Sequence, residues 1–228
     1  WHRFILIELL SYHGISMTDL STGSIAPAII RFGTEEQKRK YLPAIWDKSM
    51  TFAIGYSEPN AGTDLASLET RAERDGDDWV INGQKIWTSG AHNTSHVWLA
   101  ARTDPKAPKH RGISMFIVPL ATPGVSVRPI WVISGDRTNE TFYEDVRVGA
   151  DALIGEEGRG WYTAANALDH ERVTIAPFGE LAGLFDSLIE TMKRRFAAVL
   201  ADRAARLRLA EVKLDVHVQR ALKVKNVA

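Results

Sequence analysis

The sequence contains no cysteine, and this absence removes several kinds of site at once. A chain of 228 residues without a thiol has no disulfide framework, no Cys-ligated zinc, no iron–sulfur cluster and no cysteine nucleophile. It is compatible with a reducing interior, and we expect a cytoplasmic protein. The sequence also has no net charge, because its 28 basic residues balance its 28 acidic residues. Because no net field would recruit a polyanion, we expect no nucleic-acid partner.

The sequence also lacks long apolar runs and the glycine-rich motifs that bind phosphates. No run approaches the roughly 20 apolar residues of a membrane span, and residues 1–4 enter an amphipathic pattern without a signal peptide. The chain begins without Met and ends inside a helical pattern, so we expect a fragment. It contains no Rossmann or P-loop glycine motif. His92 and His96 would not share a helix face, so we expect no metal site.

The remaining composition, 45% hydrophobic and 25% charged, is that of an ordinary globular protein. Its patterning changes twice along the chain. Residues 1–48 are helical in pattern, residues 49–154 contain seven short β-rich runs, and residues 155–228 are helical again. Strands without intervening helices favour a sandwich or barrel. We therefore predict an α+β protein with a helical N-terminal domain, a middle antiparallel β domain of two packed sheets and a partial C-terminal helical bundle.

Local signals place several element ends. Asp19 is a suitable N-cap type, Gly33 is expected to end the helix that follows it, and residues 34–37 have the form of a capping box. In the β segment, residues 75–77 and 82–83 have the composition of hairpin turns. These signals predict helices up to about residue 46 and tight hairpins after it.

Two segments of the β region have side chains suited to a planar ligand. Residues 55–67 follow a short apolar strand and gather hydroxyls, carboxylates, proline and glycine within a few positions. Residues 85–90 carry the indole of Trp87. A planar, polar cofactor with phosphates could use both segments. The alternatives are that Ser57 and Thr63 only stabilise turns and that Trp87 packs in the core.

The helix expected after the β region carries a carboxylate on an apolar face. Glu171 lies at helical spacing from four apolar residues and therefore interrupts their stripe. Burial there would raise its pKa, as is typical of a general base that works near neutral pH. The alternative is a structural ion pair with an arginine. The four apolar residues are Trp161, Ala164, Leu168 and Ile175.

Five segments together resemble the acyl-CoA dehydrogenase family. They are residues 55–67, 84–90, 109–114, 139–148 and 154–161, and they occur in family order and at family spacing over nearly the whole chain. The resemblance implies an FAD-dependent enzyme with a helical, a β and a second helical domain, at 1–48, 49–154 and 155–228 respectively.

The resemblance also implies roles for individual residues. Ser57 would bond the pyrimidine end of the flavin, Thr63 would lie near the thioester arm of CoA, and Trp87 would pack on the flavin. Ser89 would approach flavin N5. The implied cofactor-binding residues are Ile54, Tyr56, Ser57, Gly62, Thr63, Trp87, Thr88 and Ser89, and the implied substrate-binding residues are Thr63, Asp169 and Arg172.

The reaction implied is α,β-dehydrogenation of an acyl-CoA thioester, with electrons passing to an electron-transferring flavoprotein. Most family members carry the base later than Ala228, but a minority carry it in the Leu-x-x-Glu-Arg context seen at residues 168–172, which favours Glu171. The family's Arg-x-x-Phe-Gly motif is matched only by residues 192–197, without the glycine. Similar departures occur in actinobacterial enzymes for steroid side-chain thioesters, which implies a heterotetramer with a second subunit as an alternative to a homo-oligomer.

Two other functions are compatible with the same family resemblance. One is a flavin oxidase or monooxygenase that admits oxygen to the cofactor. The other is a non-catalytic partner subunit of a heteromeric dehydrogenase. Fast reoxidation of the flavin in air would indicate the first, and a purified chain that stays colourless with FAD would indicate the second.

Overall fold

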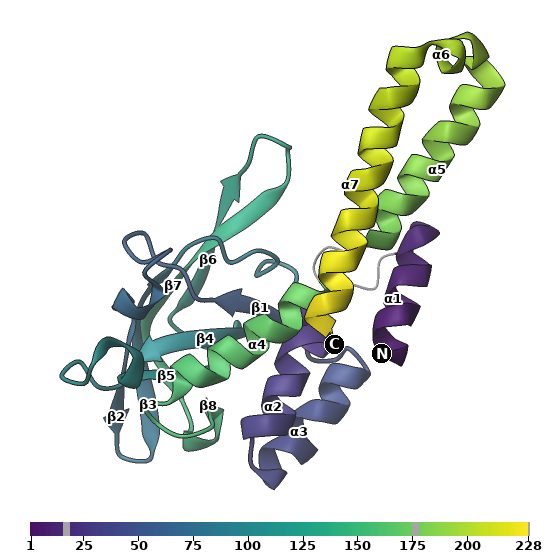
Figure 1. Ribbon diagram of the computed structural model, residues 1–228. Helices are drawn as coiled ribbons and strands as arrows, with labels where there is room; N and C mark the ends of the chain where they lie inside the picture. Colours follow the sequence, from purple (N-terminus) through teal and green to yellow (C-terminus); the bar gives the residue numbers. More distant parts are fainter. Residues whose placement is uncertain (16–18, 175–177, 228) are drawn as a thin grey trace. The chain divides into compact units, whose positions relative to one another are not determined.

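The computed structural model describes residues 1–15, 19–174 and 178–227, with side chains for all of these except residues 3, 172–174, 226 and 227 (Figure 1). The chain forms two compact units, which we call the helical unit (Trp1–Thr18 with His170–Ala228) and the sheet unit (Asp19–Asp169). These units are defined by packing, whereas the three domains expected from the sequence follow changes of secondary structure. The domain boundaries therefore stay a prediction.

Helices of the sheet unit begin and end largely where the sequence predicts. The Asp19 carboxylate accepts the N–H of Ser21 at 3.0 Å and so caps the first turn. Thr34 and Gln37 form the predicted capping box, with reciprocal bonds of 3.2 and 2.9 Å. Pro43 lies inside the third helix without ending it. These helices are a π-helical turn Ser21–Ile25, α2 (Ala26–Phe32), α3 (Glu35–Trp46) and α4 (Gly160–Thr174), whose last residues belong to the helical unit.

The strands form one hydrogen-bonded sheet in the order β6-β7-β3-β2-β4-β5-β8, with β1 also paired to β4. They are β1 (Phe52–Gly55), β2 (Arg71–Asp75), β3 (Asp78–Lys85), β4 (His96–Arg102), β5 (Ile113–Pro119), β6 (Val125–Trp131), β7 (Arg137–Val148) and β8 (Leu153–Ile154). Short 3₁₀ turns, Leu65–Ser67, Lys109–Arg111 and Ala150–Ala152, lie in the connections. β6 and β7 extend together as a long ribbon (Figure 1).

This sheet differs in two ways from the expected pair of antiparallel sheets. Two layers do pack face to face, since the Trp79 and Phe116 rings lie 5.2 Å apart across them, but the pairing of Arg71 with Arg102 joins the layers into one sheet. In addition, β1 and β2 run parallel to β4. Long connections separate these strands in the sequence, and parallel pairing requires such connections. Alternation patterns predict which face is buried but not these pairings.

β4 and β5 lie at the centre and are buried on both faces. Val97 and Leu99 of β4 join the core between the two layers, whereas Trp98 and Ala100 join the core under α2, α3 and α4. Because side chains alternate along a strand, one strand serves two cores. The helices and the second layer are therefore anchored on the same central strands.

The expected hairpin turn at residues 82–83 is wrong. Both residues lie inside β3, at a register shift against β7. Gly83 has φ +151°, and an added Cβ would lie 2.5 Å from Oγ1 of Thr70. Asn82 donates to the Asp145 carboxylate at 3.0 Å. These contacts override the local turn preference of Asn-Gly and produce a bulge. The other predicted hairpin turn, at residues 75–77, is confirmed, because β2 ends at Asp75 and β3 begins at Asp78.

In the helical unit, α1 packs closely on α5. An added Cβ on Gly179 would lie 2.0 Å from the Glu8 carbonyl oxygen, and one on Gly183 would lie 2.2 Å from that of Tyr12. The Gly179 N–H donates to the Glu8 carboxylate at 2.7 Å. α5 and α7 form a helical hairpin through α6 (Figure 1). The helices are α1 (His2–Tyr12), α5 (Phe178–Arg195), α6 (Ala197–Ala201) and α7 (Arg203–Val227).

The expected helical C-terminal region is thus confirmed. Ile175, one of the residues expected on the apolar face of α4, lies outside the described residues. Across the described ranges, no helix combines the length and the apolar character needed to cross a membrane.

Candidate functional site

The candidate site begins in the loop that follows β1. The chain reverses at Pro59 and Asn60, and Glu58 and Ala61 exchange backbone hydrogen bonds of 2.9 and 3.1 Å across this turn. Tyr56, just before it, is buried, and its hydroxyl accepts the indole N–H of Trp98 at 3.0 Å. The polar loop is therefore fastened to the sheet by a buried aromatic anchor.

A buried ion pair fixes the loop to the end of β3. Lys85 is fully buried, and its Nζ lies 2.8 Å from Oε1 of Glu58 and 3.0 Å from the carbonyl oxygen of Tyr56. Burial lowers the pKa of the Lys85 ammonium from 10.5 to about 8, against the opposing influence of Glu58. An ammonium with two acceptors in this position ties the loop and the strand together.

The Glu58 carboxylate is also held by the peptide backbone. It accepts the N–H of Glu69 at 2.6 Å and that of Thr70 at 2.8 Å. Burial acts to raise the pKa of this carboxyl, but the Lys85 charge and the hydrogen-bond donors outweigh it and hold the pKa below its ordinary value. This pair was not predicted from the sequence. Lys85 lies an even number of positions after Trp79 and Ile81, and this indicates that it lies on the same inward face of the strand.

Trp87 follows the ion pair and has an unusual conformation. Its φ is +61°, in the left-handed region that bulky residues rarely adopt, and its side chain is 55% exposed. The Ile86 N–H donates to the Ser57 carbonyl at 2.9 Å, so the backbone just before Trp87 is bonded to the loop after β1. The alternative that Trp87 is a core residue is therefore wrong. Strained, exposed residues of this kind are typical of functional sites.

The residues after Trp87 are held by the first part of β7. The Thr88 N–H and C=O bond the backbone and side chain of Asn139, both at 2.9 Å. The hydroxyls of Ser89 and Thr138 lie 3.0 Å apart, and those of Thr88 and Thr141 lie 3.3 Å apart. Thr88 is fully buried, whereas Ser89 is exposed.

The remaining predicted cofactor residues border the same loop. Ile54 and Ser57 are half-buried, while Gly62 and Thr63 are exposed. Within the part of the chain that the structure describes, the hydroxyls of Ser57 and Thr63 have no hydrogen-bond partner. They are therefore available to a ligand. The neighbouring Asp64 instead pairs with a lysine, Lys109, at 2.7 Å on the surface.

Glu171 is described in the helical unit, separately from Trp87 in the sheet unit. Its carboxyl is half-buried, and burial raises its pKa above the ordinary value for glutamate. Trp161 and Leu168, at the predicted spacing on α4, pack against the core of the sheet unit. Asp169 is exposed, and the side chain of Arg172 lies outside the described residues.

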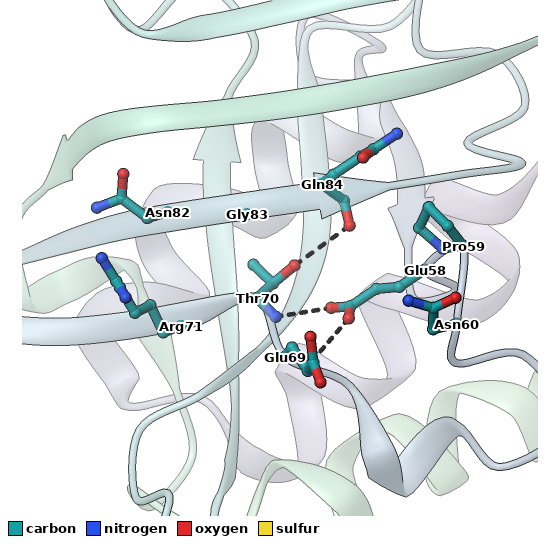
Figure 2. Close-up of a pocket in the computed structure, with 9 residues that line it drawn as sticks. All are labelled: Glu58, Pro59, Asn60, Glu69, Thr70, Arg71, Asn82, Gly83 and Gln84. Carbon is teal, nitrogen blue, oxygen red and sulfur yellow. Dashed lines mark hydrogen bonds between the residues drawn. The ribbon is translucent and has the colours of Figure 1, made fainter.

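A hollow of about 430 Å³ is lined in part by the Pro59–Asn60 turn (Figure 2). Figure 2 shows the Glu58 carboxylate directed at the backbone of Thr70 and Glu69. The predicted cofactor residues do not line this hollow. Its lining is Glu58, Pro59, Asn60, Glu69, Thr70, Arg71, Asn82, Gly83 and Gln84.

Comparison with known families gives three consecutive matches. The acyl-CoA dehydrogenase N-terminal domain matches residues 1–49, the middle domain matches residues 53–146, and the C-terminal domain matches residues 158–228. The chain is 50% identical to acyl-CoA dehydrogenase FadE29 of Mycobacterium tuberculosis over 164 residues, covering 72% of this chain and 42% of that protein. It thus spans less than half of that relative's length.

Two solved structures of high similarity are both complexes named for two components. The Tcur3481-Tcur3483 steroid ACAD is 41% identical, with a TM-score of 0.91 over 98% of this chain and 58% of that chain. The ChsE4-ChsE5 complex from Mycobacterium tuberculosis is 40% identical, with a TM-score of 0.89 over 98% of this chain and 59% of that chain.

Proposed function

The chain belongs to the acyl-CoA dehydrogenase family, and we propose that its activity is the FAD-dependent α,β-dehydrogenation of an acyl-CoA thioester. The observation that carries the proposal is the exposed Trp87, which is held at positive φ after a residue bonded to the loop of Ser57. Among the described residues, the Ser57 and Thr63 hydroxyls of that loop have no hydrogen-bond partner. Backbone strain at a bulky residue persists only where the surrounding structure holds it, and such residues cluster at functional sites.

The residues at this place suit FAD in shape and chemistry. The indole of Trp87 offers a flat apolar face to a tricyclic ring, because aromatic systems attract one another in stacked or edge contacts. Ser57 and Thr63 offer hydroxyls that can donate to carbonyl or phosphate oxygens. Ser89 adds a further hydroxyl two residues after the indole. We assign these four residues to the cofactor, together with Ile54, Tyr56, Gly62 and Thr88 as its support.

In the proposed reaction Glu171 removes the α-proton of the thioester. A raised pKa suits this role, since a base is most effective when its pKa lies near the working pH. Bound FAD would accept the β-hydrogen together with its electron pair. The proton on Glu171 and that hydride balance the two C–H bonds that break as the double bond forms. Asp169 and Arg172 are assigned to the CoA portion.

We further propose a bulky substrate and a second subunit. One similar solved structure is named a steroid ACAD, and both similar complexes carry two component names. The chain also lacks glycine after Phe196, at the end of α5, where Phe196 itself is 54% exposed. These observations favour a steroid side-chain or fatty acyl thioester as substrate and a heterotetramer rather than a homo-oligomer. The proposal also includes an electron-transferring flavoprotein as acceptor and a cytoplasmic location.

The proposal is tested by adding acyl-CoA to the FAD-loaded protein without oxygen. We expect the visible flavin absorbance to bleach in the wild type and in Glu180→Gln, a control on an exposed carboxylate of the same unit. In Glu171→Gln the bleaching rate should fall by about 1,000-fold or more, because the proton acceptor is lost.

Three outcomes would contradict parts of this proposal. Unchanged bleaching in Glu171→Gln removes the base assignment. Full FAD affinity in Trp87→Ala removes the indole from the cofactor site. Rapid reoxidation in air would indicate an oxidase or monooxygenase, whereas a colourless protein after FAD addition would indicate a non-catalytic subunit.

A further inference from the structure

We propose that Asn139 is a positioning residue that holds Trp87 and Ser89 in the geometry that the cofactor requires. This inference rests on the proposed function, since it takes the two residues as part of the flavin site. Asn139 lies near the start of β7 and is fully buried. It would not touch the cofactor itself and would act through Thr88.

All polar groups of the Asn139 side chain are in use. Its Oδ1 accepts the Nε–H of Arg137 at 2.8 Å, and its Nδ2 donates to the Thr88 carbonyl at 2.9 Å. Because arginine only donates, it must face the oxygen, and this fixes the orientation of the amide. Nδ2 also lies 3.2 Å from Nδ1 of His92.

The backbone of Asn139 completes the contact. Its carbonyl oxygen accepts the Thr88 N–H at 2.9 Å, so one residue binds both the donor and the acceptor of the residue that follows Trp87. On the other side of Trp87, the Ile86 N–H is bonded to the Ser57 carbonyl at 2.9 Å. A non-glycine residue at positive φ costs roughly 1–3 kcal/mol and persists only when its neighbours are held. Asn139 contributes to that restraint on the C-terminal side of Trp87.

The contact is not needed merely to satisfy a buried carbonyl. The Thr88 oxygen also accepts the Ala91 N–H at 3.3 Å, so it keeps a partner when the Asn139 amide is removed. Ser89 is also tied to this part of β7, because its hydroxyl contacts that of Thr138, the residue before Asn139. Loss of the amide is therefore expected to displace the 87–89 segment rather than to leave its backbone unpaired.

The first experiment uses Asn139→Ala, with Asn82→Ala as a matched control. Asn82 is also an asparagine bonded across β3 and β7, through Asp145, but it lies away from Trp87. We expect the amide hydrogens of Thr88 and Ser89 to exchange at least tenfold faster in cofactor-free Asn139→Ala than in wild type. The control should leave both rates unchanged.

A second measurement uses FAD-loaded protein and Asn139→Asp. The aspartate keeps an acceptor for Arg137, so it preserves a purely structural role, but it places an oxygen against the Thr88 carbonyl. We expect Asn139→Asp to remain folded at the assay temperature, which circular dichroism checks. We also expect a shifted flavin spectrum and a kcat at least tenfold lower, with KM for acyl-CoA changed less than threefold.

The proposal is overturned if exchange at Thr88 and Ser89 stays at the wild-type rate in Asn139→Ala. It is equally overturned if Asn139→Asp keeps the wild-type flavin spectrum and kcat, because the Asn139 side chain would then act only as a structural support for Arg137. If the wild-type protein binds no FAD, the proposed function fails, while the exchange rates of the cofactor-free protein still decide the role of Asn139.

Discussion

Replacing Lys85 by methionine tests whether the buried ion pair organises the site. The substitution keeps the length and apolar character of the stem but removes the ammonium that binds Glu58 and the Tyr56 carbonyl. Breaking a buried pair on one side costs about 3–5 kcal/mol, because the other charge remains buried. Glu58 keeps the Glu69 and Thr70 N–H donors, so we expect a loss near the lower limit, about 3 kcal/mol.

The assay is urea unfolding followed by tryptophan fluorescence at pH 7. All seven tryptophans except Trp1 belong to the sheet unit, so the signal reports on the unit that holds the pair. The double variant Lys85→Met with Glu58→Gln removes the orphaned charge. We expect it to be less destabilised than the sum of the two single variants, by about 2 kcal/mol.

The pH dependence provides an independent check. Burial lowers the pKa of Lys85 to about 8 in the folded protein, against 10.5 in the unfolded chain. Between these values the unfolded chain binds more protons at this site, so the site stabilises the folded state increasingly as pH rises. The methionine variant lacks this contribution. Its deficit should therefore grow by about 2 kcal/mol from pH 8 to pH 10. A single-variant cost under about 1 kcal/mol, or a deficit independent of pH, would refute the reasoning.

Three further predictions concern other parts of the chain. Burial raises the pKa of Glu171 above its ordinary value of 4.5, and a protonated base is inactive, so the rate of flavin reduction should rise with pH through a midpoint above 4.5; a lower midpoint contradicts the assignment. Gly83→Ala should lower the stability of the sheet unit by about 2–3 kcal/mol in thermal unfolding, because the added Cβ meets Thr70 at 2.5 Å and φ is +151°. Gly179→Ala should separate α1 from α5, because its Cβ would lie 2.0 Å from the Glu8 carbonyl oxygen; unchanged helix content and melting temperature by circular dichroism would count against this.

The sequence predicts well what depends on neighbours in the chain. The capping box of α3 is confirmed because both partners lie within four residues and need no tertiary contact. Similarly, Trp161 and Leu168 pack inward on α4 because helical spacing alone places them on one face. For Glu171, the predicted raised pKa also agrees with the structure.

Features that depend on distant partners are missed. The Asn82-Gly83 pair has a strong turn preference, yet Thr70 and Asp145 hold it inside a strand. The positive φ of Trp87 has no local signal, because it follows from hydrogen bonds to segments far away in the sequence. For the same reason the resemblance could name the site segments but could not supply the role of Asn139.

Because β4 and β5 are buried on both faces, they also restrict which substitutions this sequence can accumulate. Every position from Val97 to Ala101 is buried, and so is every position from Ile113 to Val118, so neither strand has a solvent-facing position that tolerates arbitrary substitution. β6, by contrast, carries exposed positions along most of its length. Neutral change should therefore accumulate in the ribbon, while the two central strands admit only exchanges among apolar or small residues that fit both layers.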